Sequence, residues 1–327
     1  MQTETLLKEL QQKGLISGEQ NALISGYEST KAFSLHYELR TLLYLGITML
    51  TGGFGVLIYQ NIDTIGHGVI VALIVLTTLG CFGYAYFKRS PFSWSEVKNP
   101  SQFTDFALLL GCMMFLVLEG YLQFQYNLFG TKYGLVTILP AIIFIAAAYY
   151  FDHRGVLSMG LTALASWVGV SIAPLSVLSA NDFSAPNFLF TAIALGLVLS
   201  VAGLFSEYKN LKKHFSFTYL LLGSNLTLIA TMVGMFNHGN WFIYTFIALT
   251  LCVGLFLYAR QTQSYIFLLM GVIYGYIAFT FMLFKILEAI NNDDLWVLAM
   301  YYFLFSGVGV VIFLINIKKI LLSGKRG

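Results

Sequence analysis

The sequence predicts an all-α, polytopic integral membrane protein with about ten transmembrane helices. Two features of the composition lead to this fold class: 58% of the 327 residues are hydrophobic and only 10% are charged. A soluble domain carries about 25% charged residues, so this chain could not cover a soluble surface. The apolar residues also gather in runs of about 20, the length that an α-helix needs to cross a bilayer.

Ten such runs follow one another along the chain. They lie near residues 41–59, 68–87, 105–123, 133–151, 155–178, 187–205, 216–236, 241–259, 264–285 and 295–317. No short apolar segment with a small-residue cleavage site precedes them, so we expect no cleavable signal peptide. The sequence therefore divides into a front segment, 1–38, and a transmembrane helical domain, 39–327.

The front segment has the pattern of a short helical hairpin over residues 5–30. Leu6, Leu7 and Leu10 form one apolar stripe at helical spacing, and Leu23, Ile24 and Tyr27 form a second. Gly14 suits the end of the first helix, and Ser17 with Gln20 fits a capping box that opens the second. Because so few residues cannot bury a core alone, the stripes must pack on something else, such as a second membrane protein or another copy of this chain.

This front segment, with its Gly-Leu-Ile-Ser turn at 14–17 and the short-looped spans behind it, resembles a family. It is similar to the bacterial predicted membrane proteins grouped as domain of unknown function 2157. The resemblance implies a protein of the bacterial cytoplasmic (inner) membrane and carries over no functional residue. In span count and size the chain also resembles the ten-span drug/metabolite transporters, by topology alone.

Lysine and arginine in the loops predict the orientation. Of the 18 such residues, all but Lys132 and Lys285 fall in the front segment, the tail or alternate loops on one side. Cytoplasmic loops carry the excess of these residues, so we expect both termini to be cytoplasmic. We also expect His153 and His214 to face lipid headgroups and the cluster 209–214 to contact anionic lipid.

A leucine or methionine followed by glycine recurs in the five helices that run outward. The glycines are Gly46, Gly111, Gly160, Gly223 and Gly271. Small residues let helix backbones approach in lipid, so these positions predict close helix packing. The spacing is compatible with a parallel repeat of four spans, and an inverted repeat of five plus five remains the alternative.

Glu119 is a carboxylate inside an apolar run. It lies 14 residues beyond Asp105, about 21 Å into a hydrocarbon core of about 30 Å, in the outer third. Ionisable groups at such depth are candidates for function. The alternative is an acid that reaches the outer interface or binds a neighbouring tyrosine. Lys285 is the obvious cation, but we favour its pairing with Glu288 at the outer interface, three residues further on.

Polar groups also lie near the middle of the seventh run. Asn225 is about 14 Å deep, with Ser224 beside it, and we expect Tyr274 and Tyr276 of the ninth run to reach it. Hydrogen bonds between helices and contact with a ligand are both compatible with these residues. Helix irregularities gather in the outer half: Pro140, Pro174, Gly52, Gly53 and Gly55. They predict an outward-open cavity bordered by runs 1, 3, 4, 5 and 9, with Glu119 in its wall.

The sequence holds no recognisable catalytic motif, phosphate loop or metal-ligand spacing, so we expect no enzyme activity, no metal and no other cofactor. We also expect membrane lipids as partners, and no nucleic acid. Two functions fit these features better than a third alternative, an enzyme that acts on lipid-linked substrates. The first is a membrane scaffold or accessory subunit that docks a partner through residues 5–30. The alternative is a carrier of a small or amphipathic molecule, through the cavity near Glu119 and Asn225.

Overall fold

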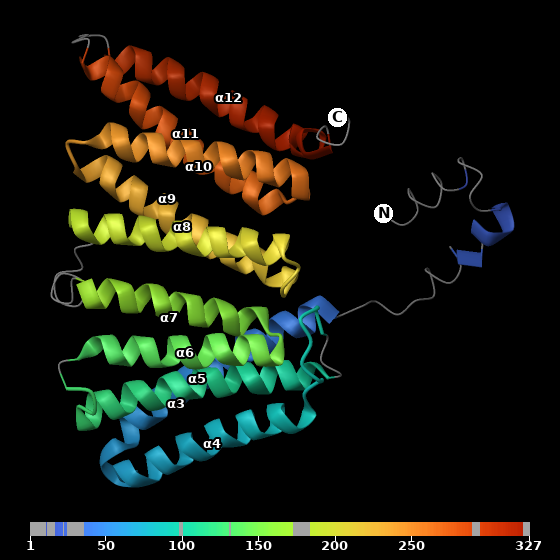
Figure 1. The fold of residues 1–327 in the computed structure, drawn as a ribbon, viewed down its shortest axis with the longest axis vertical. Helices are drawn as coiled ribbons and strands as arrows, with labels where there is room; N and C mark the ends of the chain where they lie inside the picture. Colours follow the sequence, from blue (N-terminus) through green and yellow to red (C-terminus); the bar gives the residue numbers. More distant parts are fainter. Residues whose placement is uncertain are drawn as a thin grey trace. The chain divides into compact units, whose positions relative to one another are not determined.

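The computed structural model is all-α and describes residues 11, 17–21, 23–24, 36–97, 101–130, 132–172, 184–289 and 295–322. Each of the ten predicted runs corresponds to one helix of this part of the chain. The exceptions at the ends are the last residues of the fifth run, which are outside the described residues, and Ser264 of the ninth run, which precedes its helix. The helices are α3 (His36–Ile65), α4 (His67–Lys88), α5 (Gln102–Tyr126), α6 (Tyr133–Phe151), α7 (Arg154–Ile172), α8 (Pro186–Tyr208), α9 (Ser216–Asn237), α10 (Trp241–Thr262), α11 (Tyr265–Ala289) and α12 (Leu295–Leu322) (Figure 1).

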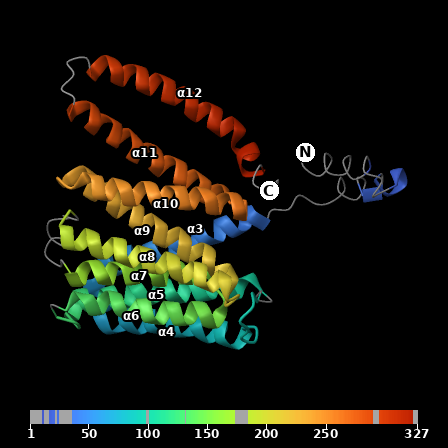
Figure 2. The same cartoon turned by 45° about the horizontal axis from the view of Figure 1, so that its top comes forward.

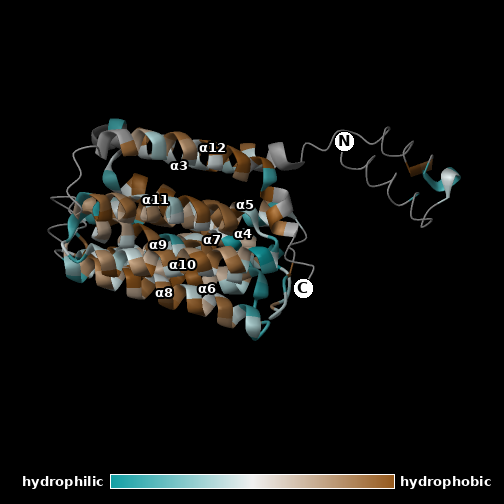
Figure 3. Cartoon of the chain, turned by 90° about the horizontal axis from the view of Figure 1, so that it is seen from above, coloured by the Kyte–Doolittle hydropathy of each residue, from teal (hydrophilic) through white to brown (hydrophobic). Residues whose placement is uncertain are grey.

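Eight of these helices, α4 to α11, are long and apolar enough to cross a membrane. In α3 and α12 the apolar stretches are shorter, over Thr41–Leu57 and Leu298–Phe313. Hydrophilic residues gather at the helix ends and loops, whereas the helix bodies are mostly hydrophobic (Figure 3). Large apolar side chains such as Phe124 and Phe205 are exposed along the helices. This distribution suits a protein surrounded by hydrocarbon.

The chain divides into two units, Met1–Phe54 and Gly55–Gly327, and the boundary falls within α3. In the first unit, the described part of the front segment has the predicted capping box. The Gln20 N–H donates to Ser17 Oγ at 3.2 Å, and the Ser17 N–H donates to Gln20 Oε1 at 2.9 Å. Of the two predicted apolar stripes, only Leu23 and Ile24 are among the described residues.

In the second unit, consecutive helices pack as antiparallel hairpins. The closest pairs are α4 with α5, α6 with α7, α8 with α9, and α10 with α11, and α9 also packs against α10. In two views α4 and α12 lie at opposite edges of the unit, with α12 beside α11 (Figures 1 and 2). A large buried cluster lies between α8, α9, α10 and α11 and includes Leu228, Ala248 and Leu268.

Four of the five glycines singled out in the sequence lie where the second helix of each hairpin meets the first. The prediction of close packing is wrong for Gly46 of α3, where a Cβ atom would meet no described atom within 4 Å. A Cβ atom at Gly160 would lie 2.9 Å from the Ile145 nitrogen, and one at Gly223 would lie 2.6 Å from the Gly196 oxygen. Gly111 and Gly271 meet Cys81 and Cys252 in the same way, at 3.2 and 3.0 Å. These distances leave room for a hydrogen atom only, so the glycines set the close approach of the helices.

Candidate functional site

A pocket of about 550 Å³ lies between α5, α6 and α7. The described residues that line it all come from these three helices. They are Met113, Leu116, Glu119, Gly120, Val136, Thr137, Pro140, Phe144, Ser158, Met159, Thr162, Ala163 and Ser166. We call this the Glu119 pocket. The predicted cavity included runs 1, 3, 4, 5 and 9, and the described residues that line this pocket come from runs 3, 4 and 5.

Helix α5 positions the carboxylate. Its first turn is capped by Ser101, whose hydroxyl accepts the Phe103 N–H at 3.2 Å, and it ends at Asn127 in the left-handed conformation. Glu119 follows the first helical residue by 17 positions, which is about 26 Å along the axis. The side chain therefore lies towards the C-terminal end of a helix long enough to span the membrane.

The Glu119 side chain is buried, at 5% exposure, and its Oε1 accepts no hydrogen bond from any residue that the structure describes. Burying a carboxyl group without a hydrogen-bond partner is costly, and natural proteins rarely do so without a reason. Glu119 also has no ion pair within the described part of the chain. Lys285 instead lies 2.8 Å from Glu288 at an exposed position, the pairing that we favoured.

Helix α6 adds a proline to the pocket wall. Pro140 has no N–H to donate to the carbonyl of Val136, one turn earlier, and both residues line the pocket. Helix α7 adds a stripe of hydroxyls, Ser158, Thr162 and Ser166, at intervals of four residues on one face. The pocket is thus mainly apolar, with a carboxylate and several hydroxyls at its wall.

The polar residues of α9 form a separate group. Asn225 Oδ1 accepts the Tyr274 hydroxyl at 3.1 Å, and its Nδ2 donates to the Leu221 oxygen at 3.0 Å. The Tyr276 hydroxyl is instead 2.9 Å from Ser306 of α12, and the Ser224 hydroxyl donates to the Leu220 oxygen in its own helix. The expectation that both tyrosines reach Asn225 is therefore wrong for Tyr276. None of these residues lines the Glu119 pocket.

The other predicted helix irregularities are not tested at this pocket. Gly52, Gly53 and Gly55 are within α3, which continues as a helix through all three. Pro174 lies outside the described residues.

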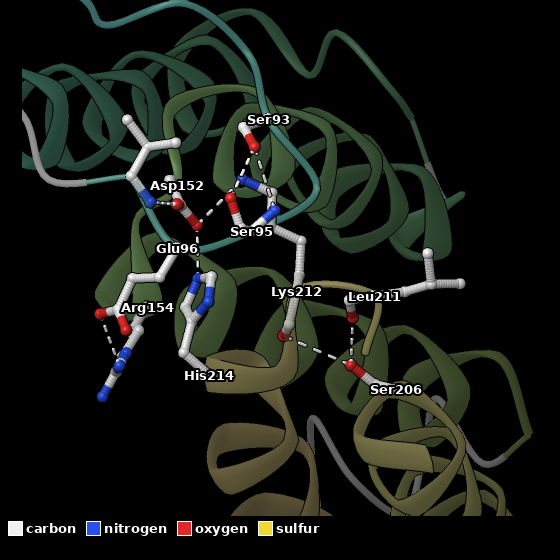
Figure 4. Close-up of polar contacts among 10 residues, drawn as sticks. Ser93, Ser95, Glu96, Asp152, Arg154, Ser206, Leu211, Lys212 and His214 are labelled. Atoms are coloured by element: carbon white, nitrogen blue, oxygen red, sulfur yellow. Dashed lines mark hydrogen bonds and ion pairs between the residues drawn. The ribbon is translucent and has the colours of Figure 1, made fainter. Parts of the chain in front are cut away.

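A second polar group joins three loops, those between α4 and α5, between α6 and α7, and between α8 and α9 (Figure 4). Asp152, which ends α6 at φ +59°, is at its centre. Its Oδ1 lies 3.1 Å from Lys212 Nζ and also contacts His214 Nε2, and its Oδ2 accepts the Val97 N–H at 2.5 Å. Asp152 therefore binds the α4–α5 loop and the α8–α9 loop at once.

Further contacts close this group, which we call the loop cluster: Asp152, Lys212, His214 and the residues bound to them. The Lys212 N–H donates to the Trp94 oxygen at 2.9 Å, and the ammonium group of Lys212 lies 5.1 Å from the centre of the Phe92 ring. Ser206 donates to the Leu211 oxygen at 2.6 Å. Glu96 and Arg154 form an ion pair at 2.8 Å beside the cluster, with about half of each side chain exposed (51% and 50%).

The loop cluster corrects the expectation that these groups face lipid headgroups. Lys212 is 1% exposed, His214 pairs with Asp152, and His153 is buried, accepting the Val156 N–H at 3.1 Å at the start of α7. The physical reason is local charge pairing: the carboxylate of Asp152 offers a partner that the sequence alone does not place near Lys212. Of the lysines in this segment, Lys209 and Lys213 remain exposed.

The comparison with protein families agrees with the architecture described above. Residues 8–157 match the family described as Predicted membrane protein (DUF2157). The match confirms the predicted family over that range, which includes most of the front segment and extends to the start of α7. The chain is a multi-pass membrane protein, and the description of the family matched over that range assigns no activity. Neither the curated proteins nor the solved structures gave a match to the chain.

Proposed function

We propose that this protein binds a small amphipathic molecule within the membrane, at the Glu119 pocket, as the first step of a carrier function. The observation that supports this is the buried carboxylate without a partner among the described residues, in the wall of a pocket of about 550 Å³. Ligand sites are mostly apolar cavities of this size with a few polar groups. Ionisable residues at membrane depth are costly to bury, so they are candidates for function.

The pocket also has the right mixture of surfaces for an amphipathic molecule. Met113, Phe144 and Met159 offer apolar surface, while Glu119 and the hydroxyls of α7 offer polar contacts. An occupant would place its polar group at the carboxylate and its apolar part along α6 and α7. A purely apolar lipid chain would leave Glu119 without a partner.

A test uses native mass spectrometry of the purified full-length chain to detect bound small molecules. Gly120 lines the pocket, and a Cβ there would meet no atom within 4 Å, so Gly120→Leu should fill the pocket without disturbing the helix. Gly254 of α10 is equally open but lies outside the pocket, so Gly254→Leu is the matched control. We expect the wild type and Gly254→Leu to carry a ligand that Gly120→Leu lacks. Equal ligand content in all three would contradict the proposal.

A second candidate, the scaffold or accessory subunit, is supported by the extent of the family match. The match begins at residue 8, so the front segment belongs to the sequence that characterises the family. We propose that residues 5–30 dock a second membrane protein or another copy of this chain. Deleting residues 1–30 should then abolish co-purification of that partner, and retention of the partner would contradict this role.

We further propose that the protein lies in the bacterial cytoplasmic membrane with both termini in the cytoplasm. The described basic residues of alternate loops support this orientation, because Arg89, Arg154 and Lys209 fall at one end of their hairpins.

A further inference from the structure

The side chains that line the Glu119 pocket favour an occupant of one charge. This inference about the class of ligand rests on the proposed function. Among the described residues that line the pocket there is one acid and no lysine, arginine or histidine. An anionic head group would therefore meet the Glu119 carboxylate with no cation to offset it.

The hydroxyls of the wall mostly present acceptors. Ser158 donates to the Arg154 oxygen at 3.1 Å, Ser166 donates to the Thr162 oxygen at 3.0 Å, and Thr137 donates to the Gly134 oxygen at 3.1 Å. A hydroxyl has one hydrogen and two lone pairs, so each of these groups can still accept but no longer donate.

The backbone of α6 adds a further acceptor. Because Pro140 lacks an N–H, the Val136 carbonyl has no donor one turn further along the helix. Of the side chains in the described wall, the Thr162 hydroxyl is the one whose hydrogen is not given to its own helix. The pocket thus holds many acceptors around a buried carboxylate and almost no donors.

We infer that the occupant is a lipophilic primary amine, a protonated ammonium group on an apolar body, whose N–H groups supply the donors that Glu119 and its neighbours lack. An ammonium group has three donors and no acceptor, which matches a wall of acceptors. Charge-assisted hydrogen bonds between ammonium and carboxylate are about twice as strong as neutral ones. The apolar part would lie against Met113, Phe144 and Met159. An aminophospholipid head group and a free amine share this ammonium chemistry.

The test measures binding of radiolabelled octylamine to the full-length chain in phosphatidylcholine nanodiscs, with empty nanodiscs subtracted, and its displacement by octan-1-ol and octanoate. The three probes share one chain length and differ in the head group. We expect octylamine to bind at least about tenfold more tightly than octan-1-ol, and octanoate not to compete. Glu119→Gln should weaken octylamine about tenfold or more and leave octan-1-ol unchanged. Glu119→Asp, which keeps the charge, should recover part of the affinity.

The outcomes separate this inference from the proposed function. If the three probes bind equally, or if Glu119→Gln leaves octylamine unchanged, the ammonium inference is wrong and the pocket remains a binding site. If none of the probes binds and Gly120→Leu behaves as the wild type, the proposed function itself fails. Nanodiscs with phosphatidylethanolamine identify the source of the ammonium group. Competition with octylamine there supports an aminophospholipid occupant, and unchanged octylamine binding supports a free amine.

Discussion

Asp152 and Lys212 form a buried ion pair that joins two loops 60 positions apart in the sequence, with 3.1 Å between Oδ1 and Nζ and side-chain exposures of 5% and 1%. Removing one partner of a buried pair costs about 3–5 kcal/mol, because the other charge is left without compensation. Since Asp152 also binds Val97 and His214, its loss would free three loop contacts at once.

We therefore predict that Asp152→Ala lowers the free energy of unfolding by about 3–5 kcal/mol. Unfolding can be followed in detergent with a thiol-reactive fluorophore, because Cys112 and Cys252 are buried in the folded protein. The neighbouring pair offers a matched control. Glu96 and Arg154 are about half exposed (51% and 50%), so Glu96→Gln should cost at most about 1 kcal/mol. Equal losses in the two variants would show that Asp152 does not hold the loops together.

A second prediction concerns the seam between α8 and α9. A Cβ atom at Gly223 would lie 2.6 Å from the Gly196 oxygen and 2.8 Å from the Ser200 nitrogen, and these backbone atoms cannot move aside as a flexible side chain would. Gly223→Ala should therefore force the helices apart and destabilise the protein by about 1–3 kcal/mol. Gly120→Ala, where the new Cβ meets nothing within 4 Å, should leave the melting temperature unchanged or slightly raised. If Gly223→Ala lowers the stability no more than Gly120→Ala does, the backbones of α8 and α9 are not in direct contact at Gly223.

The helices of this fold could be predicted from the sequence because each apolar run carries its own evidence. The run 133–151 corresponds to α6 (Tyr133–Phe151) at both ends, and most other helices begin or end within a few residues of the expected positions. Helix α3 (His36–Ile65) is longer than the run 41–59 at both ends. The capping box of Ser17 and Gln20 was predictable for the same reason, since its two members lie three residues apart.

The loop cluster was not predictable, because it depends on contacts between distant segments. Asp152 meets Val97 and Lys212, which are 55 and 60 positions away, and no local pattern relates these residues. A lysine between basic neighbours is usually solvated, and only the fold shows that Lys212 is buried beside a carboxylate.

The Glu119 pocket could be predicted in part. An acid in an apolar run is visible in the sequence, and so is the proline of the next helix. The hydroxyl stripe of Ser158, Thr162 and Ser166 was also visible at intervals of four, but nothing in the sequence indicated which helix it faces. The error over Tyr276 has a geometric origin: residues two apart on a helix point about 200° apart, so Tyr274 and Tyr276 face different neighbours.

A third prediction follows from the bond between Asn225 and Tyr274. Interhelical hydrogen bonds in membranes contribute about 0.6 kcal/mol on average and up to about 1.7 kcal/mol. In a double-mutant cycle, Asn225→Ala and Tyr274→Phe should show a coupling energy in that range, because each removes the same contact between α9 and α11. Tyr276→Phe is the control, since its hydroxyl contacts Ser306 instead, and it should show no coupling to Asn225→Ala. Octylamine binding should be unchanged in Asn225→Ala, because Asn225 does not line the pocket.

The last prediction concerns orientation, which the arrangement of charges implies and labelling can decide. The α8–α9 loop contains Lys209, Lys212 and Lys213, whereas the α9–α10 loop, His238 to Asn240, contains no lysine or arginine. A basic loop is retained in the cytoplasm, so the two loops should lie on opposite sides of the membrane.

Asn210 and Asn240 are both exposed at loop positions, and each can be replaced by cysteine without removing a buried contact. The native cysteines lie within helices, so an impermeant maleimide should not reach them in intact cells. We expect Asn240→Cys to be labelled from outside the cell and Asn210→Cys to be labelled only after permeabilisation. The reverse pattern would place both termini outside and would also move the Glu119 pocket towards the cytoplasmic leaflet.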